Sequence, residues 1–325
     1  MWLSAGFQHD MQTPLITAII CTRNRVEMLE LALRSLLHQT RSRADYEIIV
    51  VDNGSTDKTG ELCEGLTGHF VRYIFEPEPG LSKARNTGWR QSRSRYIAYL
   101  DDDAIADECW IDALICAYES QRPVPAAVGG PVRLKWEAPE PEWMNPSLRF
   151  PLGFLDWGSR PKRLMPSEFL IGANCSYRRE FLEEFDGFDE HLGRKKDCLL
   201  SGEETLIQRK IEQAGEYLFY APTASVQHFV PISRTQPRWF YKRFFWGGVS
   251  DVLLSRSAHA TSPSVKHGPV AGPQTGGVLL RLICNSAAAM GFAATRGRRI
   301  QARIYMAYVL GWLWAKLRRV NAGAP

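Results

Sequence analysis

The chain has 325 residues, of which 45% are hydrophobic and 23% are charged, and this composition excludes a wholly disordered chain, a collagen and a small disulfide-stabilised scaffold. No segment repeats at a fixed period, which excludes solenoids and propellers. The length predicts about two domains, or one large α/β domain with an appendage.

Residues 15–134 alternate between apolar, β-branched runs and segments with helical spacing. We expect strands at 15–21, 46–52, 71–75, 95–101 and 126–134, and helices at 26–39, 55–66, 81–92 and 109–120. Continuous apolar strands that alternate with helices predict an α/β fold with a mostly parallel sheet, covered by helices on both faces. Such sheets bind ligands at the carboxyl ends of their strands, so the polar residues there are candidate site residues.

The remaining segments follow this α/β core. A Pro- and Trp-rich loop is expected at 135–166 and favours a binding element. We then expect a strand and helix over 169–180, a helix at 202–215, short strands at 216–222 and 225–229, and an aromatic, basic helix at 234–254. The predicted organisation is an extension (1–14), a core domain (15–256), a Ser/Pro/Gly/Ala-rich linker (257–277) and a tail (278–325).

The net charge of +5 hides an asymmetry, because no Asp or Glu follows Asp251. Residues 1–251 sum to −5, and the tail has ten Lys and Arg. The tail also contains two apolar runs, 278–294 and 304–315, neither of which is a clean membrane span. Trp312 and Trp314 beside basic residues favour contact with an anionic membrane surface over nucleic acid. The alternative is two helices packed on the core.

Seven cysteines, an odd number without a CxxC pair, indicate neither a zinc knuckle nor a thioredoxin motif. The N-terminal residues have no apolar core of signal-peptide length. Reduced thiols in a cytoplasmic protein are the simplest interpretation.

Three adjacent carboxylates, Asp101, Asp102 and Asp103, come directly after the expected strand at 95–101. They would repel one another unless a cation lay among them. Mg²⁺ and Mn²⁺ take carboxylate oxygens and bring phosphates with them, so this cluster predicts a divalent metal site. The single His228 is a further candidate ligand, although a lone histidine is more often a hydrogen-bonded core residue.

Basic residues at two other strand–helix junctions suit phosphates. Arg23 and Arg25 precede the first expected helix, whose free N–H groups favour a diphosphate. Lys83 and Arg85 flank another helix start, where the alternative is a surface salt bridge. Asp52 ends a strand and could accept from a base or a ribose hydroxyl, or belong to a plain tight turn.

Glu203 and Glu204 begin the helix expected at 202–215, where the helix dipole stabilises an ionised carboxylate. An available carboxylate suits a general base, and it also suits a helix charge without chemistry. Neither GxGxxG nor Walker A is found, which argues against a dinucleotide dehydrogenase and a P-loop NTPase.

The order TRNR, VVDNGSTD, GLSKARNTG, LDDDA, GANCSYRRE and GEETL resembles family 2 glycosyltransferases with the GT-A fold, over residues 15–250. The resemblance implies inverting transfer of a sugar from a nucleoside-diphosphate donor, with UDP expected as the nucleoside diphosphate and Mn²⁺ or Mg²⁺ as cofactor. The acceptor would be a hydroxyl of a glycan or lipid-linked acceptor in polysaccharide or cell-surface glycan synthesis. We expect the enzyme at the cytoplasmic, inner face of the membrane.

Site residues follow from the residue patterns and this resemblance together. The nucleotide sugar is expected to contact Thr22, Arg23, Arg25, Asp52, Lys83, Arg85, Asp101 and Asp102. Asp103 would bind the metal, with Asp101 and His228, and the acceptor side would include Asn174 and Trp239. The family's catalytic Asp is Glu204 here, and Glu203 remains open as the base. Asn53 replaces the family's second Asp in VDDGSTD.

Two other functions are alternatives to this glycosyltransferase. A nucleotidyltransferase that makes nucleotide sugars would need a glycine- and arginine-rich loop near the N-terminus, and TRNR has no glycine. A non-catalytic sugar-nucleotide-binding scaffold would need losses in the acidic cluster, and the cluster is complete.

Overall fold

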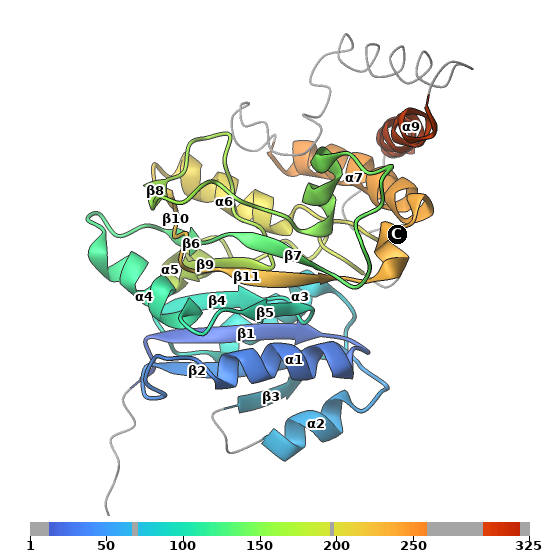
Figure 1. Ribbon diagram of the computed structural model, residues 1–325. Helices are drawn as coiled ribbons and strands as arrows, with labels where there is room; N and C mark the ends of the chain where they lie inside the picture. Colours follow the sequence, from blue (N-terminus) through green and yellow to red (C-terminus); the bar gives the residue numbers. More distant parts are fainter. Residues whose placement is uncertain (1–12, 67–70, 196–197, 259–294, 319–325) are drawn as a thin grey trace, which may run out of the picture.

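The computed structural model describes residues 13–66, 71–195, 198–258 and 295–318 (Figure 1). Its strands are β1 (Ile16–Thr22), β2 (Tyr46–Asp52), β3 (Val71–Phe75), β4 (Tyr96–Leu100), β5 (Ala104–Ala106), β6 (Ala127–Gly129), β7 (Val132–Trp136), β8 (Lys162–Arg163), β9 (Asn174–Arg178), β10 (Leu218–Tyr220) and β11 (Val226–Val230). Its helices are α1 (Val26–Leu37), α2 (Thr59–Leu66), α3 (Leu81–Gln91), α4 (Trp110–Ser120), α5 (Arg179–Glu184), α6 (Glu203–Gln213), α7 (Pro237–Ala258), α9 (Arg296–Leu317) and the 3₁₀ helices η1 (Pro146–Leu152) and η2 (Ile232–Thr235). Most of the predicted linker, the first apolar run and most of the predicted N-terminal extension lie outside the described residues, and α7 extends to Ala258, two residues into that linker.

The large sheet has the strand order β3-β2-β1-β4-β9-β6-β10-β8. β1 pairs in parallel with β2 on one side and with β4 on the other, and β2 pairs in parallel with β3. The order therefore reverses between β1 and β4, which is the switch point where open α/β sheets bind ligands. The expected mostly parallel α/β fold is confirmed, although β9 runs antiparallel between β4 and β6.

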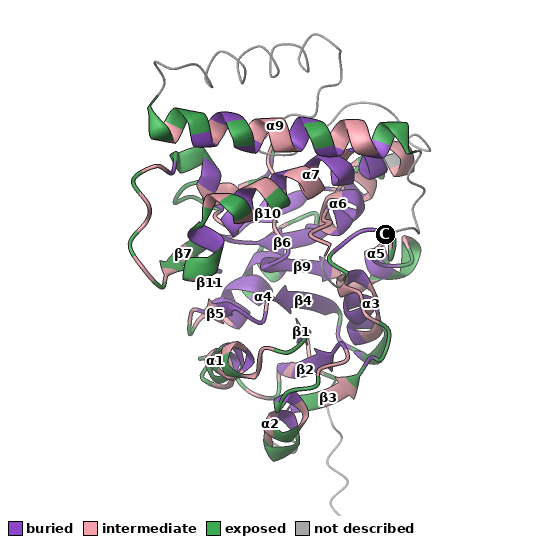
Figure 2. Ribbon diagram, turned by 90° about the vertical axis from the view of Figure 1, so that its right-hand side faces the viewer, coloured by how far each residue is buried: buried purple, intermediate pink, exposed green. Residues whose placement is uncertain are grey.

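Helices cover both faces of this sheet. Side chains of α1, α2 and α4 join one hydrophobic cluster, and those of α3, α5 and α6 join a second cluster on the opposite face. Within β1, Ala18 and Ile20 belong to the first cluster and Ile19 to the second, as the alternation of a strand requires. Figure 2 shows the central strands buried between these layers.

A second sheet has three strands in the order β5-β11-β7. β11 runs antiparallel to β5 and parallel to β7. The single strand predicted at 126–134 is wrong in this respect, because it forms β6 in the large sheet and β7 in the small one. The chain changes sheets at Gly130 and Pro131: a Cβ at Gly130 would overlap the carbonyl of Ala224, and Pro131 has no N–H for a ladder.

The helix predicted from residue 55 begins only at Thr59. Asp57 accepts hydrogen bonds from the backbone N–H of Thr59 and of Val26, so the preceding residues form a turn tied to the start of α1. Asn24 accepts from the N–H of Thr56 and strengthens the same link. This turn fixes the loop that follows β1 at the switch point.

The C-terminal helix α9 packs along α7 (Figure 2). The two backbones approach closely at two glycines: a Cβ at Gly311 would overlap the carbonyl of Phe245, and one at Gly248 would overlap that of Tyr308. The hydroxyl of Tyr308 donates to Asp251 at 2.6 Å. Packing on the core, the alternative from the sequence, therefore describes residues 296–317. Among the helices described, none combines the length and apolarity needed to cross a membrane.

Candidate active site

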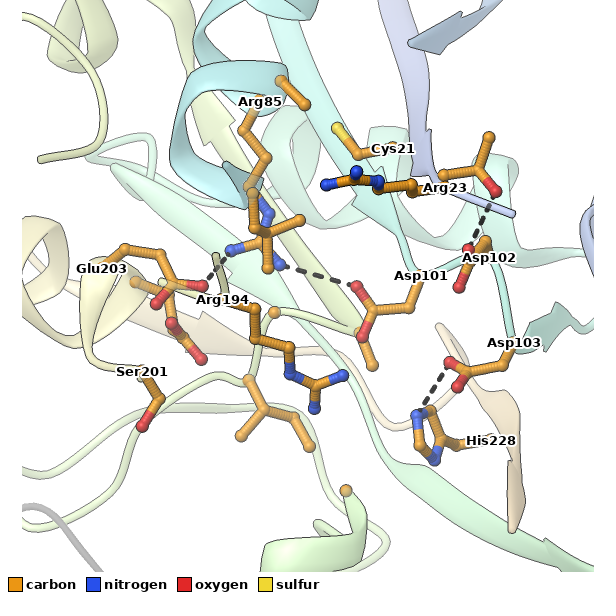
Figure 3. Close-up of a pocket in the computed structure, with 18 of the residues that line it drawn as sticks. Cys21, Arg23, Arg85, Asp101, Asp102, Asp103, Arg194, Ser201, Glu203 and His228 are labelled. Atoms are coloured by element: carbon orange, nitrogen blue, oxygen red, sulfur yellow. Dashed lines mark hydrogen bonds and ion pairs between the residues drawn. The ribbon is translucent and has the colours of Figure 1, made fainter. Parts of the chain in front are cut away.

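A cavity of about 650 Å³ opens at the switch point between β1 and β4 (Figure 3). Thr22 ends β1, and Asp101, Asp102 and Asp103 follow β4, so the parallel pairing of these strands brings both polar ends together. Six arginines and five carboxylates line the cavity: Arg23, Arg25, Arg85, Arg194, Arg234, Arg243, Asp101, Asp102, Asp103, Glu203 and Glu204.

Asp102, which follows β4, links the end of β4 to the end of β1 through hydrogen bonds. Its carboxylate accepts a hydrogen bond from the Thr22 hydroxyl at 2.9 Å and from Arg25 at 2.8 Å. Burial raises the pKa of Asp102 to about 6, although Arg25 opposes that rise. The side chain therefore joins the end of β1, the start of α1 and the end of β4.

Asp103 lies among three cationic or polar partners. One oxygen is 3.0 Å from Nε2 of His228, and the other accepts from Arg234 at 2.9 Å and from Arg25 at 3.0 Å. Burial alone would raise its pKa, but His228 and Arg234, with a contribution from Arg25, hold the pKa of Asp103 well below its usual range. Asp103 is thus a carboxylate at neutral pH.

Strand register explains why a histidine 125 positions away meets the cluster. His228 on β11 pairs with Ala104 on β5, the residue after Asp103. The N–H of Phe229 donates to the carbonyl of Asp103 at 2.8 Å and fixes this register. Gly153, at φ +100°, lies against the His228 ring, where a side chain would crowd the imidazole.

The donor atoms of Asp101, Asp103 and His228 lie within 4.8 Å of one another. Two carboxylate oxygens and an imidazole nitrogen suit Mn²⁺, and the ionised state of Asp103 makes it a ready ligand. The residues therefore fit a divalent cation, as the sequence predicted for these three positions.

Arg85 connects the acidic cluster with the start of α6. Its guanidinium donates to Glu203 at 2.8 Å and lies 3.5 Å from Asp101 (Figure 3). The guanidinium also lies over the rings of Tyr99 and Phe188, which hold it in place. Gly172 makes room for it, because a Cβ there would overlap the guanidinium.

Glu203 and Glu204, side by side at the start of α6, differ in their surroundings. Glu203 is buried and paired with Arg85, and burial together with Glu204 raises its pKa to about 8. Glu204 lines the cavity and makes no ion pair within 4.0 Å in the described chain. One buried oxygen of each carboxylate has no hydrogen-bond partner among the described residues.

Four predicted site residues do not line this cavity. Asp52 accepts from the Tyr73 hydroxyl at 2.9 Å and from the N–H of Ser55, while its neighbour Asn53 reaches the cavity. Lys83 pairs with Glu78 at 3.2 Å, the surface salt bridge considered as its alternative. Both therefore make structural contacts here.

The two predicted acceptor-side residues also lie elsewhere. Asn174 is fully buried: its carbonyl accepts from Trp110, and its amide donates to the carbonyls of Pro131 and Ala224. Trp239 on α7 packs edge-on against Phe240 in the cluster shared with α9.

Three further arginines line the cavity, Arg194, Arg234 and Arg243, and no motif in the sequence predicted them. Arg234 is in η2, six residues after His228. Its closeness in sequence to the candidate ligand His228 was the one signal that could have indicated Arg234 as a site residue. Arg194 precedes a loop and Arg243 is inside α7, so neither lies at a strand end. The wall formed by Phe150–Gly153 was expected only as part of a long binding loop.

Comparisons with known proteins agree with this geometry. The sequence model described as glycosyl transferase family 2 matches residues 17–185, slightly more than half of the chain. A glucosyl-dolichyl phosphate glucuronosyltransferase of Haloferax volcanii is 29% identical over 74% of this chain and 77% of its own. The succinoglycan biosynthesis protein ExoM of Rhizobium meliloti is 29% identical over 91% and 92% of the two chains. A Pyrobaculum calidifontis mannosyltransferase, solved with GDP-mannose and Mn²⁺, shares the fold, with a TM-score of 0.59, 18% identity and coverage of 94% and 87%.

Proposed function

The chain belongs to glycosyl transferase family 2 and is a glycosyltransferase of the GT-A type, and we propose that it transfers a sugar with inversion from a UDP-sugar to a hydroxyl group. The observation that supports this reaction best is one cavity that holds the cluster of Asp101, Asp103 and His228 together with the unpaired Glu204. The cluster suits the diphosphate end of the donor, and Glu204 suits the acceptor hydroxyl.

The donor would lie against the switch point. Asp101, Asp103 and His228 would hold Mn²⁺ or Mg²⁺, which when bound neutralises charge that develops on the leaving diphosphate. Arg25 and Arg234 keep Asp103 oriented, and Thr22 keeps Asp102 in place. Arg23, which lies exposed at the cavity, adds positive charge beside the nucleotide.

Glu204 would be the general base. It would accept the proton of the acceptor hydroxyl, whose oxygen then attacks the anomeric carbon from the face opposite the leaving group. Glu203 is buried and its carboxylate pairs with Arg85, so it is less available to the acceptor hydroxyl than Glu204. Arg85 would orient the donor sugar by fixing Glu203 and Asp101 on one side of the cavity.

The acceptor is proposed to be a glycan or a lipid-linked glycan, in polysaccharide or cell-surface glycan synthesis. The name of the Haloferax relative contains a lipid-linked sugar, and that of ExoM a polysaccharide. We also propose attachment at the cytoplasmic face of a membrane. In support, a hollow of about 460 Å³ is lined by Arg296, Arg299 and Arg303 of α9, with Ile300, Pro237 and Tyr241.

Titration calorimetry of UDP tests the donor site. Wild-type protein with Mn²⁺ should bind UDP more tightly than GDP or dTDP, and EDTA should weaken that binding. Asp103→Asn should weaken it more than about tenfold, the factor that corresponds to a lost contact of about 1.4 kcal/mol. Asp186→Asn, an exposed aspartate outside the cavity, is the matched control.

Two results would contradict the donor assignment in different ways. Tighter binding of GDP would change the nucleotide and leave the metal site in place. Unchanged Mn²⁺-dependent UDP binding by Asp103→Asn would remove Asp103 from the metal site.

A further inference from the structure

Three arginines of the cavity, Arg23, Arg194 and Arg243, have no carboxylate partner among the described residues, and Arg23 belongs to the donor side, in the loop after β1. Arg25, Arg85 and Arg234 each form an ion pair with the acidic residues, whereas neither Arg194 nor Arg243 has a carboxylate within 4.0 Å among the described residues. Both line the cavity on the side of Ser201 and Glu204. Figure 3 shows the guanidinium of Arg194 in the open space between Glu203 and His228.

Arg243 is poorly satisfied where it lies. Among the described residues its guanidinium reaches only the Ser201 hydroxyl and the carbonyl of Leu199, both at 3.4 Å, and its buried Nε has no hydrogen-bond partner there. Burial, with repulsion from Arg194, lowers the pKa of Arg243 to about 10. A buried cation with such weak partners is costly, and an anion between the two arginines would compensate it.

The charges of the cavity leave room for such an anion. Six arginines against five carboxylates leave one positive charge, and a divalent cation increases the excess to three. The diphosphate of a nucleotide sugar carries two negative charges, so one positive charge remains after donor and metal are bound. Arg23 would lie beside the nucleotide, so the other two unpaired arginines, Arg194 and Arg243, offer this charge on the side of Ser201 and Glu204.

We propose that Arg194 and Arg243 form an oxyanion subsite for the acceptor, so that the hydroxyl presented to Glu204 belongs to a molecule with a phosphate or carboxylate group. This inference rests on the proposed function, because it needs a donor site and a base. It assigns the anion to the acceptor because Arg243 contacts Ser201, in the loop that leads into α6, and Glu204 at the start of α6 would face the acceptor hydroxyl. The donor side is occupied by Arg85 and Asp101.

The test uses full-length protein saturated with UDP and Mg²⁺, so that the diphosphate subsite is filled. Methyl phosphate, methyl glucuronide and neutral methyl glucoside are titrated separately by calorimetry. One equivalent of at least one anionic probe should bind, and the glucoside should bind more weakly. Comparison of the phosphate with the glucuronide identifies which oxyanion the subsite prefers.

Arg243→Gln and Arg194→Gln should each weaken binding of the anionic probe by about 10–100-fold, as expected for loss of a charge-assisted hydrogen bond. Arg194 is exposed, so its replacement keeps the test valid even if Arg243→Gln lowers stability. Arg238→Gln, an exposed arginine of α7 outside the cavity, is the control and should bind like wild type.

UDP affinity, measured without probe, separates this inference from the proposed function. Failure of wild type to bind UDP would contradict the proposed function itself. If both arginine variants lose affinity for UDP and for the probe by the same factor, the arginines bind the donor diphosphate and the proposed acceptor subsite is wrong. Equal binding of the anionic probes by wild type and both variants would also overturn it. A preference of wild type for UDP-glucuronate over UDP-glucose that both variants lose would overturn it too, because the arginines would then contact the donor sugar.

Discussion

The adjacent carboxylates of Glu203 and Glu204 differ because only one of them has a cation at hand. Arg85 donates to Glu203 inside the protein, while Glu204 faces the cavity without an ion pair in the described chain. Two carboxylates with different environments can take different roles in one site. We propose that Glu204 accepts the proton and that Glu203 holds Arg85 in position.

Glutamine substitutions test that assignment, since they keep the shape and remove the charge. Glu204→Gln should lower turnover by about 10²–10⁴-fold, the range for loss of a general base, with little change in UDP affinity. Glu203→Gln should change UDP affinity and melting temperature, because it leaves Arg85 partly uncompensated. Steady-state kinetics and calorimetry distinguish the two, with exposed Glu183→Gln as control. A larger turnover loss in Glu203→Gln than in Glu204→Gln would exchange their roles.

Sequence reasoning located the acidic cluster because carboxyl ends of parallel strands share one edge, a rule that needs no side-chain detail. It could not assign Asp52 or Asn174 their contacts, which depend on Tyr73 and Trp110 from distant elements. Arg243 was missed for the same reason: a helical position becomes part of a site only through packing.

At the scale of elements, packing of the tail on the core was one of two alternatives from the sequence, but α7 was not predicted as the partner of α9. Gly248 and Gly311 allow backbone contact between the two helices, and no local pattern in the sequence indicates which helix each of them meets. Strands with continuous apolar runs were predicted well, since burial on both faces leaves a clear pattern. A strand was also expected within 169–180, but the antiparallel direction of β9 was not, because an apolar run does not indicate strand direction.

Asp251 makes the α7–α9 contact sensitive to pH. Burial raises its pKa to about 6, against a usual value near 3.8. Between these values the folded state binds more protons than the unfolded state, so stability falls as the pH rises from about 4 to about 6 and levels off above. The term amounts to at most about 3 kcal/mol, at about 1.4 kcal/mol for each pH unit.

Denaturant unfolding at pH 4, 5, 6 and 7 measures this dependence in wild type and Asp251→Asn. The difference in unfolding free energy between them should shift in favour of the variant as the pH rises to 6, and then stay constant. The amide can still accept from Tyr308, so the variant keeps the helix contact. A difference that does not vary with pH would show that Asp251 has an ordinary pKa in the folded protein.

At the scale of the whole molecule, charge divides the protein into two regions. Residues up to Asp251 sum to −5, and every ionised side chain after it is positive. In α9, Ile300, Ile304 and Tyr308 pack in one cluster with Phe240 and Phe244 of α7. Arg298, Arg299 and Arg303 remain exposed. Packing and membrane contact are therefore compatible, because the arginines stay exposed beside the contact with α7.

A triple substitution on α9 tests membrane contact without removing the helix that covers α7. Each arginine that reaches an anionic surface contributes about 1 kcal/mol, so Arg296→Gln/Arg299→Gln/Arg303→Gln should weaken vesicle binding by on the order of 100-fold. Co-sedimentation with phosphatidylserine-containing vesicles at low salt measures this, and 0.5 M salt should weaken wild-type binding because it screens exposed charges. Arg93→Gln/Arg122→Gln/Arg160→Gln removes the same charge from exposed positions outside α7 and α9 and should bind like wild type. If both triple variants lose binding equally, only net charge acts. If the α9 variant sediments like wild type, these arginines do not meet the membrane, and α9 serves to cover α7.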